Sequence, residues 1–317
     1  MAKFNSNHSS RSRSKGGFYI IRLLVYGIVL ILLLWKLLQF FKNYHATPFG
    51  EPEGSTQTQK PLVPPSEWND TVDITPNLPN VNGNNQLISH KYYTLSYSEN
   101  HEEAEWVAYS LTRDQLNAPK QNRFDYFAQD LSIPTRSALH RDYTGSGYTR
   151  GHLAPAADMS FDPTAAEECF YMSNISPQEK YFNQGIWREL EECVRDWSRK
   201  NMKLYIVTGP ILSTGILKKI GNSRVSVPSL FYKVLLDLEG PEMKGIGFIV
   251  PNASSDQPLE NYMTTIDSVE NLSGINFFNA VSKNKLIESL EQKVDKSLWK
   301  VDQNRYRRRV EDWNKRE

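Results

Sequence analysis

The sequence predicts a folded domain of the α+β (mixed α/β) class that follows a membrane-spanning segment. Strand-like segments precede and follow one amphipathic helix over residues 183–197, and this order indicates a sheet packed against helices. The strand candidates are residues 92–97, 204–208, 231–238 and 246–250, and residues 102–111 fit a strand or a short helix. Hydrophobic residues make up 39% of the 317 residues, and aromatics 12%, which excludes a wholly disordered chain.

The N-terminal part of the chain predicts a signal anchor. Residues 18–41 are mostly apolar, and Arg22 and Lys36 stand near the ends, where their long side chains can reach the lipid headgroups. Residues 1–17 form a basic tail with four Lys/Arg and no acid, which the positive-inside rule places in the cytoplasm. A cleaved signal peptide and a mitochondrial presequence are the alternatives.

Three further parts follow the anchor. Residues 42–89 contain seven prolines and many small polar residues, so we expect a disordered linker. Residues 90–282 carry the strand and helix patterns of the folded domain. Residues 283–317 form a charged extension with 11 basic and 7 acidic residues, which fits a solvated helix covering the domain or a tail that contacts phosphate.

The formal net charge of +1 conceals two opposite parts. Residues 1–45 carry seven Lys/Arg and no acid, which leaves 30 basic against 36 acidic residues in the rest of the chain. This mildly acidic body disfavours a nucleic-acid binder that relies on a diffuse basic surface, but it allows a few placed arginines. The two cysteines exclude a disulfide scaffold and a multi-cysteine zinc module.

Arg150 and His152 are candidates for a phosphate site. In a strand, both side chains would face the same side, and Gly151 between them would leave room for a close approach. A guanidinium binds two phosphoryl oxygens at once, and its charge keeps a neighbouring imidazole neutral and able to accept a proton. Taken alone, a histidine is more often structural than catalytic.

The amphipathic helix carries two more candidates. Its apolar stripe is formed by Ile186, Trp187, Leu190, Val194 and Trp197, with Arg188, Glu192, Arg195 and Asp196 on the far side. Asn183 lies at the centre of this stripe and fits either an N-cap or a neutral oxygen ligand for Mg²⁺. Glu191 lies at its edge and fits a solvated carboxylate or an acceptor for the waters of a metal ion.

Asn174 ends an apolar strand predicted at residues 169–173, before a turn at residues 175–177. Turn chemistry alone would explain an asparagine there. Cys169 and Cys193 fit free buried thiols or a disulfide, because the predicted topology places the domain in an oxidising compartment.

The central stretch resembles the DNA/RNA non-specific endonuclease family, the ββα-metal nucleases of the endonuclease G and Serratia type. The resemblance rests on the runs TRGHLAP (149–155), SNISPQ (173–178) and NQGIWRELE (183–191). The spacings match as well, with nine residues from Asn174 to Asn183 and eight from Asn183 to Glu191. Weaker likeness extends over about residues 90–282 and includes QNRFDYFAQD at residues 121–130.

The resemblance implies a central antiparallel-type sheet flanked by helices, and a role for each matching residue. His152 matches the general base, Asn183 the direct metal ligand, and Glu191 the carboxylate that acts on the metal through water. The remaining matches are Arg150 and Arg123, which contact the phosphate, and Asn174, which supports the site. The chain departs from the family's usual Asp-Arg-Gly-His motif at one position, where Thr149 replaces the aspartate.

The function implied is metal-dependent hydrolysis of DNA or RNA with little sequence specificity, which leaves 5′-phosphate ends. Mg²⁺ is the expected cofactor, with Mn²⁺ or Ca²⁺ as alternatives and no organic cofactor. The expected partners are the nucleic-acid substrate, the membrane and, as an option, a second copy of the chain. The alternative function is a catalytically weak relative that binds nucleic acid for uptake at a membrane surface.

The predicted location of the catalytic domain is periplasmic or extracellular. The domain would be carried by a single-pass membrane protein with a cytoplasmic N-terminus. A secreted protein and one of the mitochondrial intermembrane space are the alternatives.

Overall fold

The computed structural model describes residues 78–122, 124, 126–213, 215–278 and 285–315. The predicted cytoplasmic tail, the predicted anchor at residues 18–41 and most of the predicted linker lie outside these described residues. Within the described ranges, no helix is both long enough and apolar enough to cross a membrane.

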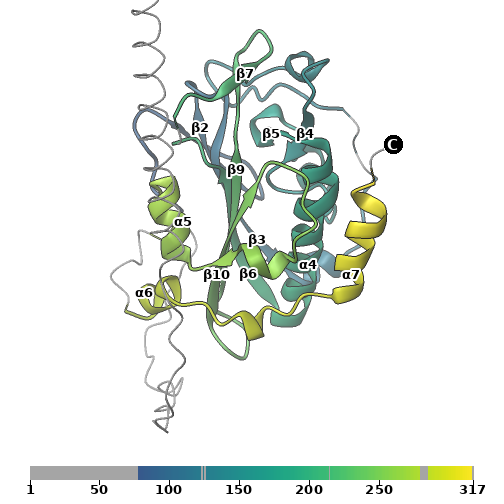
Figure 1. The fold of residues 1–317 in the computed structure, drawn as a ribbon. Coiled ribbons are helices and arrows are strands. Elements are labelled where there is room, and N and C mark those ends of the chain that lie inside the picture. Colours follow the sequence, from purple (N-terminus) through teal and green to yellow (C-terminus); the bar gives the residue numbers. More distant parts are fainter. Residues whose placement is uncertain (1–77, 123, 125, 214, 279–284, 316–317) are drawn as a thin grey trace, which may run out of the picture. The chain divides into compact units, whose positions relative to one another are not determined.

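Within the described part of the chain, seven strands form one antiparallel sheet in the order β1-β2-β3-β6-β9-β10-β11 (Figure 1). These strands are β1 (Gln86–Ser89), β2 (Thr94–Ser98), β3 (Glu103–Thr112), β6 (Lys203–Pro210), β9 (Leu230–Asp237), β10 (Lys244–Pro251) and β11 (Met263–Thr264). Two small antiparallel pairs stand apart from it, β4 (Thr149–His152) with β5 (Ile175–Gln178), and β7 (Lys218–Ile220) with β8 (Val225–Val227). The predicted α+β class with a central antiparallel sheet is confirmed.

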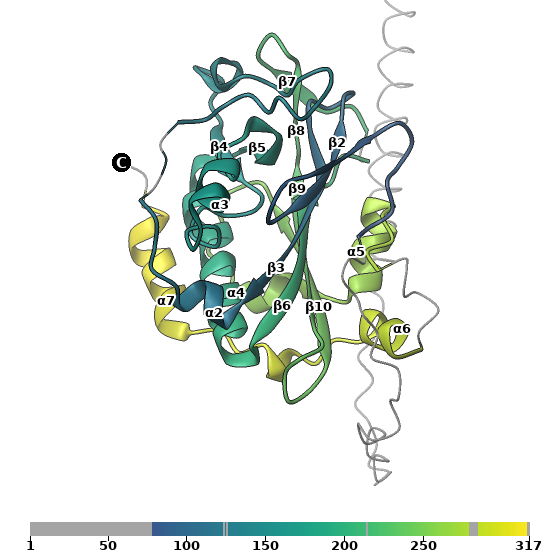
Figure 2. The ribbon, with the colours of Figure 1, turned by 180° about the vertical axis from the view of Figure 1, so that it is seen from behind.

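Helices cover both faces of the central sheet, with α4 on one side and α5 and α6 on the other (Figures 1 and 2). The α-helices are α2 (Arg113–Asn117), α3 (Pro163–Glu168), α4 (Arg188–Asn201), α5 (Ile266–Ser273), α6 (Lys285–Gln292) and α7 (Gln303–Arg308). The 3-10 turns are η2 (His140–Tyr143), η3 (Met172–Asn174), η5 (Leu259–Tyr262) and η7 (Lys296–Leu298), and the π-helical turns are η4 (Phe182–Trp187) and η8 (Arg309–Trp313).

Strand β9 shows why the central strands read as nearly continuous apolar runs. Phe231 and Leu235 belong to the core cluster under α4, whereas Tyr232 and Val234 belong to the cluster under α5 and α6. Successive side chains of a strand point to opposite faces, and both faces of this sheet are covered, so both must be apolar.

The boundaries of several elements differ from the predicted ones. The segment 102–111 fits a strand or a short helix by its sequence, and all of it except Glu102 lies in strand β3. Residues 78–89 are not part of the linker, contrary to the prediction, because they contain β1 and pack on the sheet, where Trp106 Nε1 donates to Asn80 O at 3.1 Å. The strand predicted at residues 169–173 is wrong, because a turn follows the end of α3 at Glu168, η3 begins at Met172, and the strand begins only at Ile175.

Candidate functional site

Strands β4 and β5 place Arg150 and His152 on one face, as the two-residue spacing predicts. The Arg150 Cζ atom and the His152 ring centroid each lie 5.6 Å from the ring centroid of Phe127. The opposite face is filled at Gly151, where an added Cβ would collide with the side chain of Gln178. A larger residue at position 151 would therefore displace the buried side chain of Gln178.

The side chains around Arg150 hold its guanidinium by stacking and hydrogen bonding. The guanidinium lies over the rings of Phe127 and Tyr143, and Nη2 donates to the carbonyl of His140 at 3.2 Å and to Thr144 Oγ1 at 3.5 Å. Burial lowers the pKa of Arg150, but from so high a value that the group stays charged. Thr144 also lines a surface hollow of about 390 Å³, so Arg150 stands beside a space open to solvent.

His152 is packed by two aromatic rings. The ring of Phe170 meets the imidazole edge to face, with centroids 4.8 Å apart, and Phe127 covers it at 5.6 Å. Such contacts hold the plane of the imidazole ring.

Asn174 is fully buried and supports the backbone that follows His152. Its Oδ1 accepts from Ala154 N at 2.9 Å, and its Nδ2 donates to Ala154 O at 3.0 Å and to Cys169 O at 2.8 Å. These three hydrogen bonds tie the loop after β4 to Asn174.

Cys169 and Cys193 are both buried and are not joined by a disulfide.

Asn183 is not an N-cap, and that interpretation is wrong. Its backbone N donates to Glu179 O at 2.9 Å inside the turn η4, and the Glu179 carboxylate instead accepts from the backbone N of Tyr181 and of Phe182, both at 2.8 Å. The side chain of Asn183 points to β4, where Nδ2 donates to Thr149 Oγ1 at 2.9 Å. No donor from the described residues reaches Oδ1, which leaves this oxygen for a ligand.

Glu191 lies on α4 above a cluster of buried charges. Burial raises the pKa of Glu191 to about 7, and the nearby cations Lys233 and Arg195 oppose this rise. Lys233 is fully buried on β9, where burial lowers its pKa to about 8, and its Nζ lies 4.9 Å from the ring centroid of Trp187. Among the described residues, Glu191 has no hydrogen bond or ion pair, so its carboxylate remains an acceptor for water.

Several residues of the site escape sequence reasoning. Arg195, which the helical wheel puts on the solvent side, is largely buried and pairs with Asp158 Oδ1 at 2.9 Å. Asp158 also accepts from Tyr109 at 2.9 Å, so a neutral and a charged donor share this carboxylate. For Lys233, the available signal is a charged residue within the apolar run at 230–237. Arg123 lies outside the described residues, so its place relative to the site is not defined.

The donor atoms at this site fit a hard divalent cation. The amide oxygen of Asn183 and the carboxylate of Glu191 are the type of ligand that Mg²⁺ takes, and Mg²⁺ keeps several of its waters. In the described ranges, no three His, Cys, Asp or Glu side chains converge to hold an ion.

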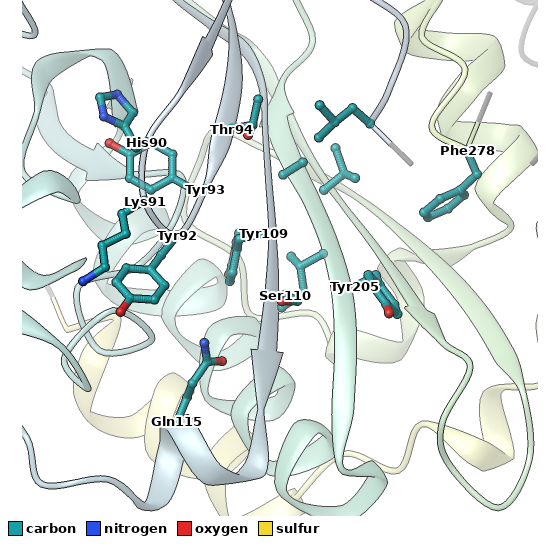
Figure 3. Close-up of a pocket in the computed structure, with 14 residues that line it drawn as sticks. His90, Lys91, Tyr92, Tyr93, Thr94, Tyr109, Ser110, Gln115, Tyr205 and Phe278 are labelled. Atoms are coloured by element: carbon teal, nitrogen blue, oxygen red, sulfur yellow. The ribbon is translucent and has the colours of Figure 1, made fainter. Parts of the chain in front are cut away.

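A separate cavity of about 260 Å³ lies along β3 and β6, where Tyr92, Tyr109 and Tyr205 contribute to its wall (Figure 3). None of the described site residues lines it. Arg150 and His152 thus lie on the β4–β5 pair and not in this cavity.

Comparison with known proteins gives a consistent result. The family model for DNA/RNA non-specific endonucleases matches residues 73–284. Human mitochondrial endonuclease G is 35% identical over 205 residues, which are 61% of this chain and 69% of that protein. A nuclease of Nostoc sp. is 33% identical over 263 residues, 76% of this chain and 93% of that protein.

A solved structure agrees with these sequences. One chain in the crystal structure of the EndoG/EndoGI complex, described under the mechanism of EndoG inhibition, is similar to this protein. The alignment covers 63% of the present chain and 89% of that chain. The TM-score is 0.57 and the identity 31%. The chain therefore belongs to the DNA/RNA non-specific endonuclease family and is a nuclease.

Proposed function

We propose that this nuclease is a metal-dependent endonuclease that hydrolyses the phosphodiester backbone of DNA or RNA and leaves 5′-phosphate ends. The observation that carries the proposal is the contact between η4 and β4. Thr149 Oγ1 accepts a hydrogen bond from Asn183 Nδ2 at 2.9 Å, so the amide oxygen is available to a cation. Thr149 belongs to the strand that also carries Arg150 and His152. This arrangement combines a cation ligand, a phosphate-binding cation and a base within neighbouring elements.

In the proposed mechanism, His152 accepts a proton from the attacking water, and the rings of Phe127 and Phe170 hold the plane of the imidazole ring. Arg150 binds the scissile phosphate and neutralises the charge that grows on it. Arg123 would add a second guanidinium, as the resemblance implies. When bound at Asn183, with its waters ordered by Glu191, a divalent cation would stabilise the charge on the leaving 3′-oxygen.

Low sequence specificity follows from the same side chains. Arg150, His152 and Asn183 all address the phosphate or its cation, and contacts to the phosphate backbone carry no base information. The proposed substrate is therefore any accessible strand of DNA or RNA.

Plasmid DNA and a structured RNA, each incubated with and without EDTA, would test this function. We expect cleavage that EDTA abolishes, and 5′-phosphate groups on the products. His152→Ala should lower the rate by about 10²–10⁴-fold while the melting temperature stays close to that of the unchanged protein. Binding of both nucleic acids without cleavage would support the alternative, a weak relative acting in uptake. A folded His152→Ala variant with full activity would refute the assignment of the base.

For the location, we propose that residues 18–41 anchor the protein in a membrane and that the catalytic domain lies outside the cytoplasm. The support is the apolar stretch itself and the four basic residues before it. A mitochondrial location is the alternative, and the name of the human relative, mitochondrial endonuclease G, supports it.

A further inference from the structure

The C-terminal arm, residues 299–314, lies beyond the region that the family model matches. Its helix α7 lies next to α4, on the side away from the central sheet (Figure 1). The contacts of the arm follow α4 backwards, from Trp197 near the end of the helix to Gly185 in the turn η4. The end of the arm thus contacts Gly185, which is two positions after Asn183 in the sequence.

The arm begins with an aromatic contact on the last turns of α4. Trp299 is fully buried and meets Trp197 edge to face, with ring centroids 5.2 Å apart. Trp197 Nε1 donates to Lys300 O at 3.0 Å. Burial of two indole rings anchors this end of the arm to the core.

Two arginines of the arm bind acids of α4. Arg305 donates to Glu192 at 3.1 Å and to Asp196 at 2.6 Å. Arg309 pairs with Glu189, and neither side chain of this pair is exposed. Arg305 and Arg309 therefore bind carboxylates of the domain, as expected for a segment that covers it.

A buried ion pair contributes little net stability, because both ions lose their hydration, but it fixes how two segments fit together. Arg309 also donates to the backbone carbonyls of Ser255 and Gln257. The loop that contains them begins at Asn252, whose Oδ1 accepts from Glu179 N at 2.8 Å. The arm is therefore linked through this loop to the start of the turn that carries Asn183.

The last contacts of the arm touch η4 and the first residue of α4. The guanidinium of Arg188 lies 4.0 Å from the ring centroid of Trp313. Asn314 donates to Ser255 O at 2.8 Å, and its Oδ1 would lie 2.6 Å from a Cβ on Gly185. Gly185 has non-helical φ and ψ angles inside η4, so Asn314 packs on the irregular point of the turn.

We infer that the C-terminal arm is a positioning element of the nuclease, which holds the irregular turn η4 so that Asn183 presents its amide oxygen to the cation. The inference rests on the proposed function, in which Asn183 is the cation ligand. Asn252 and Glu179 hold the turn at its start, and Trp313 and Asn314 hold it after Asn183. An α4 without the arm would keep its apolar face on the sheet but lose the contacts on its outer face.

The test compares variants of the full chain. The double variant Trp313→Ala/Asn314→Ala removes the side-chain contacts at the end of the arm. Trp313→Tyr keeps an aromatic ring for Arg188 to pack on. Arg308→Ala is the matched control, because Arg308 is exposed on the same arm. Mn²⁺ binding is measured by electron paramagnetic resonance without nucleic acid, and amide hydrogen exchange and thermal melting are recorded for each variant.

For the double variant, we expect Mn²⁺ binding about 10- to 100-fold weaker and faster exchange confined to residues 182–188. Arg308→Ala should match the unchanged protein, and Trp313→Tyr should lie close to it. Unchanged Mn²⁺ affinity in the double variant would overturn the inference. Faster exchange throughout the domain would also overturn it, because it would show a general structural role.

Asn183→Ala, measured in parallel, separates this inference from the proposed function. If Asn183→Ala binds Mn²⁺ normally, the cation ligand is wrongly assigned and the inference fails with it. If Asn183→Ala loses Mn²⁺ while the double variant keeps it, the inference about the arm alone fails.

Discussion

At the scale of single residues, Thr149 shows how this chain departs from the usual family motif and still orders Asn183. The Thr149 hydroxyl has one proton, which it donates to Gln178 O at 2.9 Å. The same oxygen can then only accept from Asn183, so the amide group of Asn183 must present its nitrogen to Thr149 and its oxygen elsewhere. A neutral hydroxyl thereby orients the amide at the position where the family motif has an aspartate.

Substitutions at Thr149 test this orientation. Thr149→Val keeps the shape but removes the acceptor, so we expect a nuclease rate or Mg²⁺ affinity lower by roughly 10- to 100-fold. The loss of stability should be about 1–3 kcal/mol, because Gln178 O and the Asn183 amide lose a partner. Thr149→Ser keeps the hydroxyl and should retain most activity. Equal Mg²⁺ titrations for the valine and serine variants would contradict the role of the hydroxyl.

At the scale of elements, the pairing of α5 and α6 gathers acidic side chains on one side of the sheet. Glu291 on α6 is 7% exposed, and its neighbours Glu270, Asp267 and Glu288 are all acidic. Burial, followed by repulsion from these acids, raises the pKa of Glu291 to about 7. The folded state therefore holds the proton of Glu291 more tightly than the unfolded chain, in which a glutamate titrates near pH 4.3.

The consequence is a stability that falls as the pH rises from about 4 to about 7, since the unfolded state loses this proton first. We expect Glu291→Gln to stabilise the protein at pH 8 by roughly 1–3 kcal/mol and to have much less effect at pH 4. Urea unfolding at the two pH values measures the difference. Glu288→Gln, at an exposed position of the same helix, removes only the weakest of the three repulsions and should change stability less at pH 8. An equal gain at both pH values would show that the charge of Glu291 is not the cause.

At the scale of the whole molecule, the chain joins a basic, apolar N-terminal part to a mildly acidic nuclease domain. If residues 18–41 anchor the protein, the full-length chain should stay in the membrane fraction after a carbonate wash. Protease added on the non-cytoplasmic side should release an active fragment that begins between residues 42 and 77. A soluble mature chain that begins after residue 41 would instead establish a cleaved signal peptide.

Local patterns in the sequence predicted much of the fold. The apolar runs that became β6, β9 and β10 and the amphipathic helix α4 are properties of short segments, because periodicity reports which sides of a segment are buried. The TRGH run likewise placed Arg150 and His152 on one face of β4. The strand predicted at residues 169–173 failed, because an apolar run of that length fits a helix end, a turn or a strand equally well.

Local sequence patterns were thus enough to predict the fold class, the family and the candidate site residues. The contacts that hold those residues become visible only in the folded structure. Thr149 and Asn183 are 34 positions apart, and Glu189 and Arg309 are 120 apart, so no local period can reveal either pair. The positions that an ideal helical wheel gives to Asn183 and Arg195 are also wrong. Asn183 lies in the π-helical turn that precedes α4, and Arg195 is largely buried because it pairs with Asp158. Contacts between distant segments depend on how whole elements pack, and the chain encodes them only through the sum of its buried surfaces and paired polar groups.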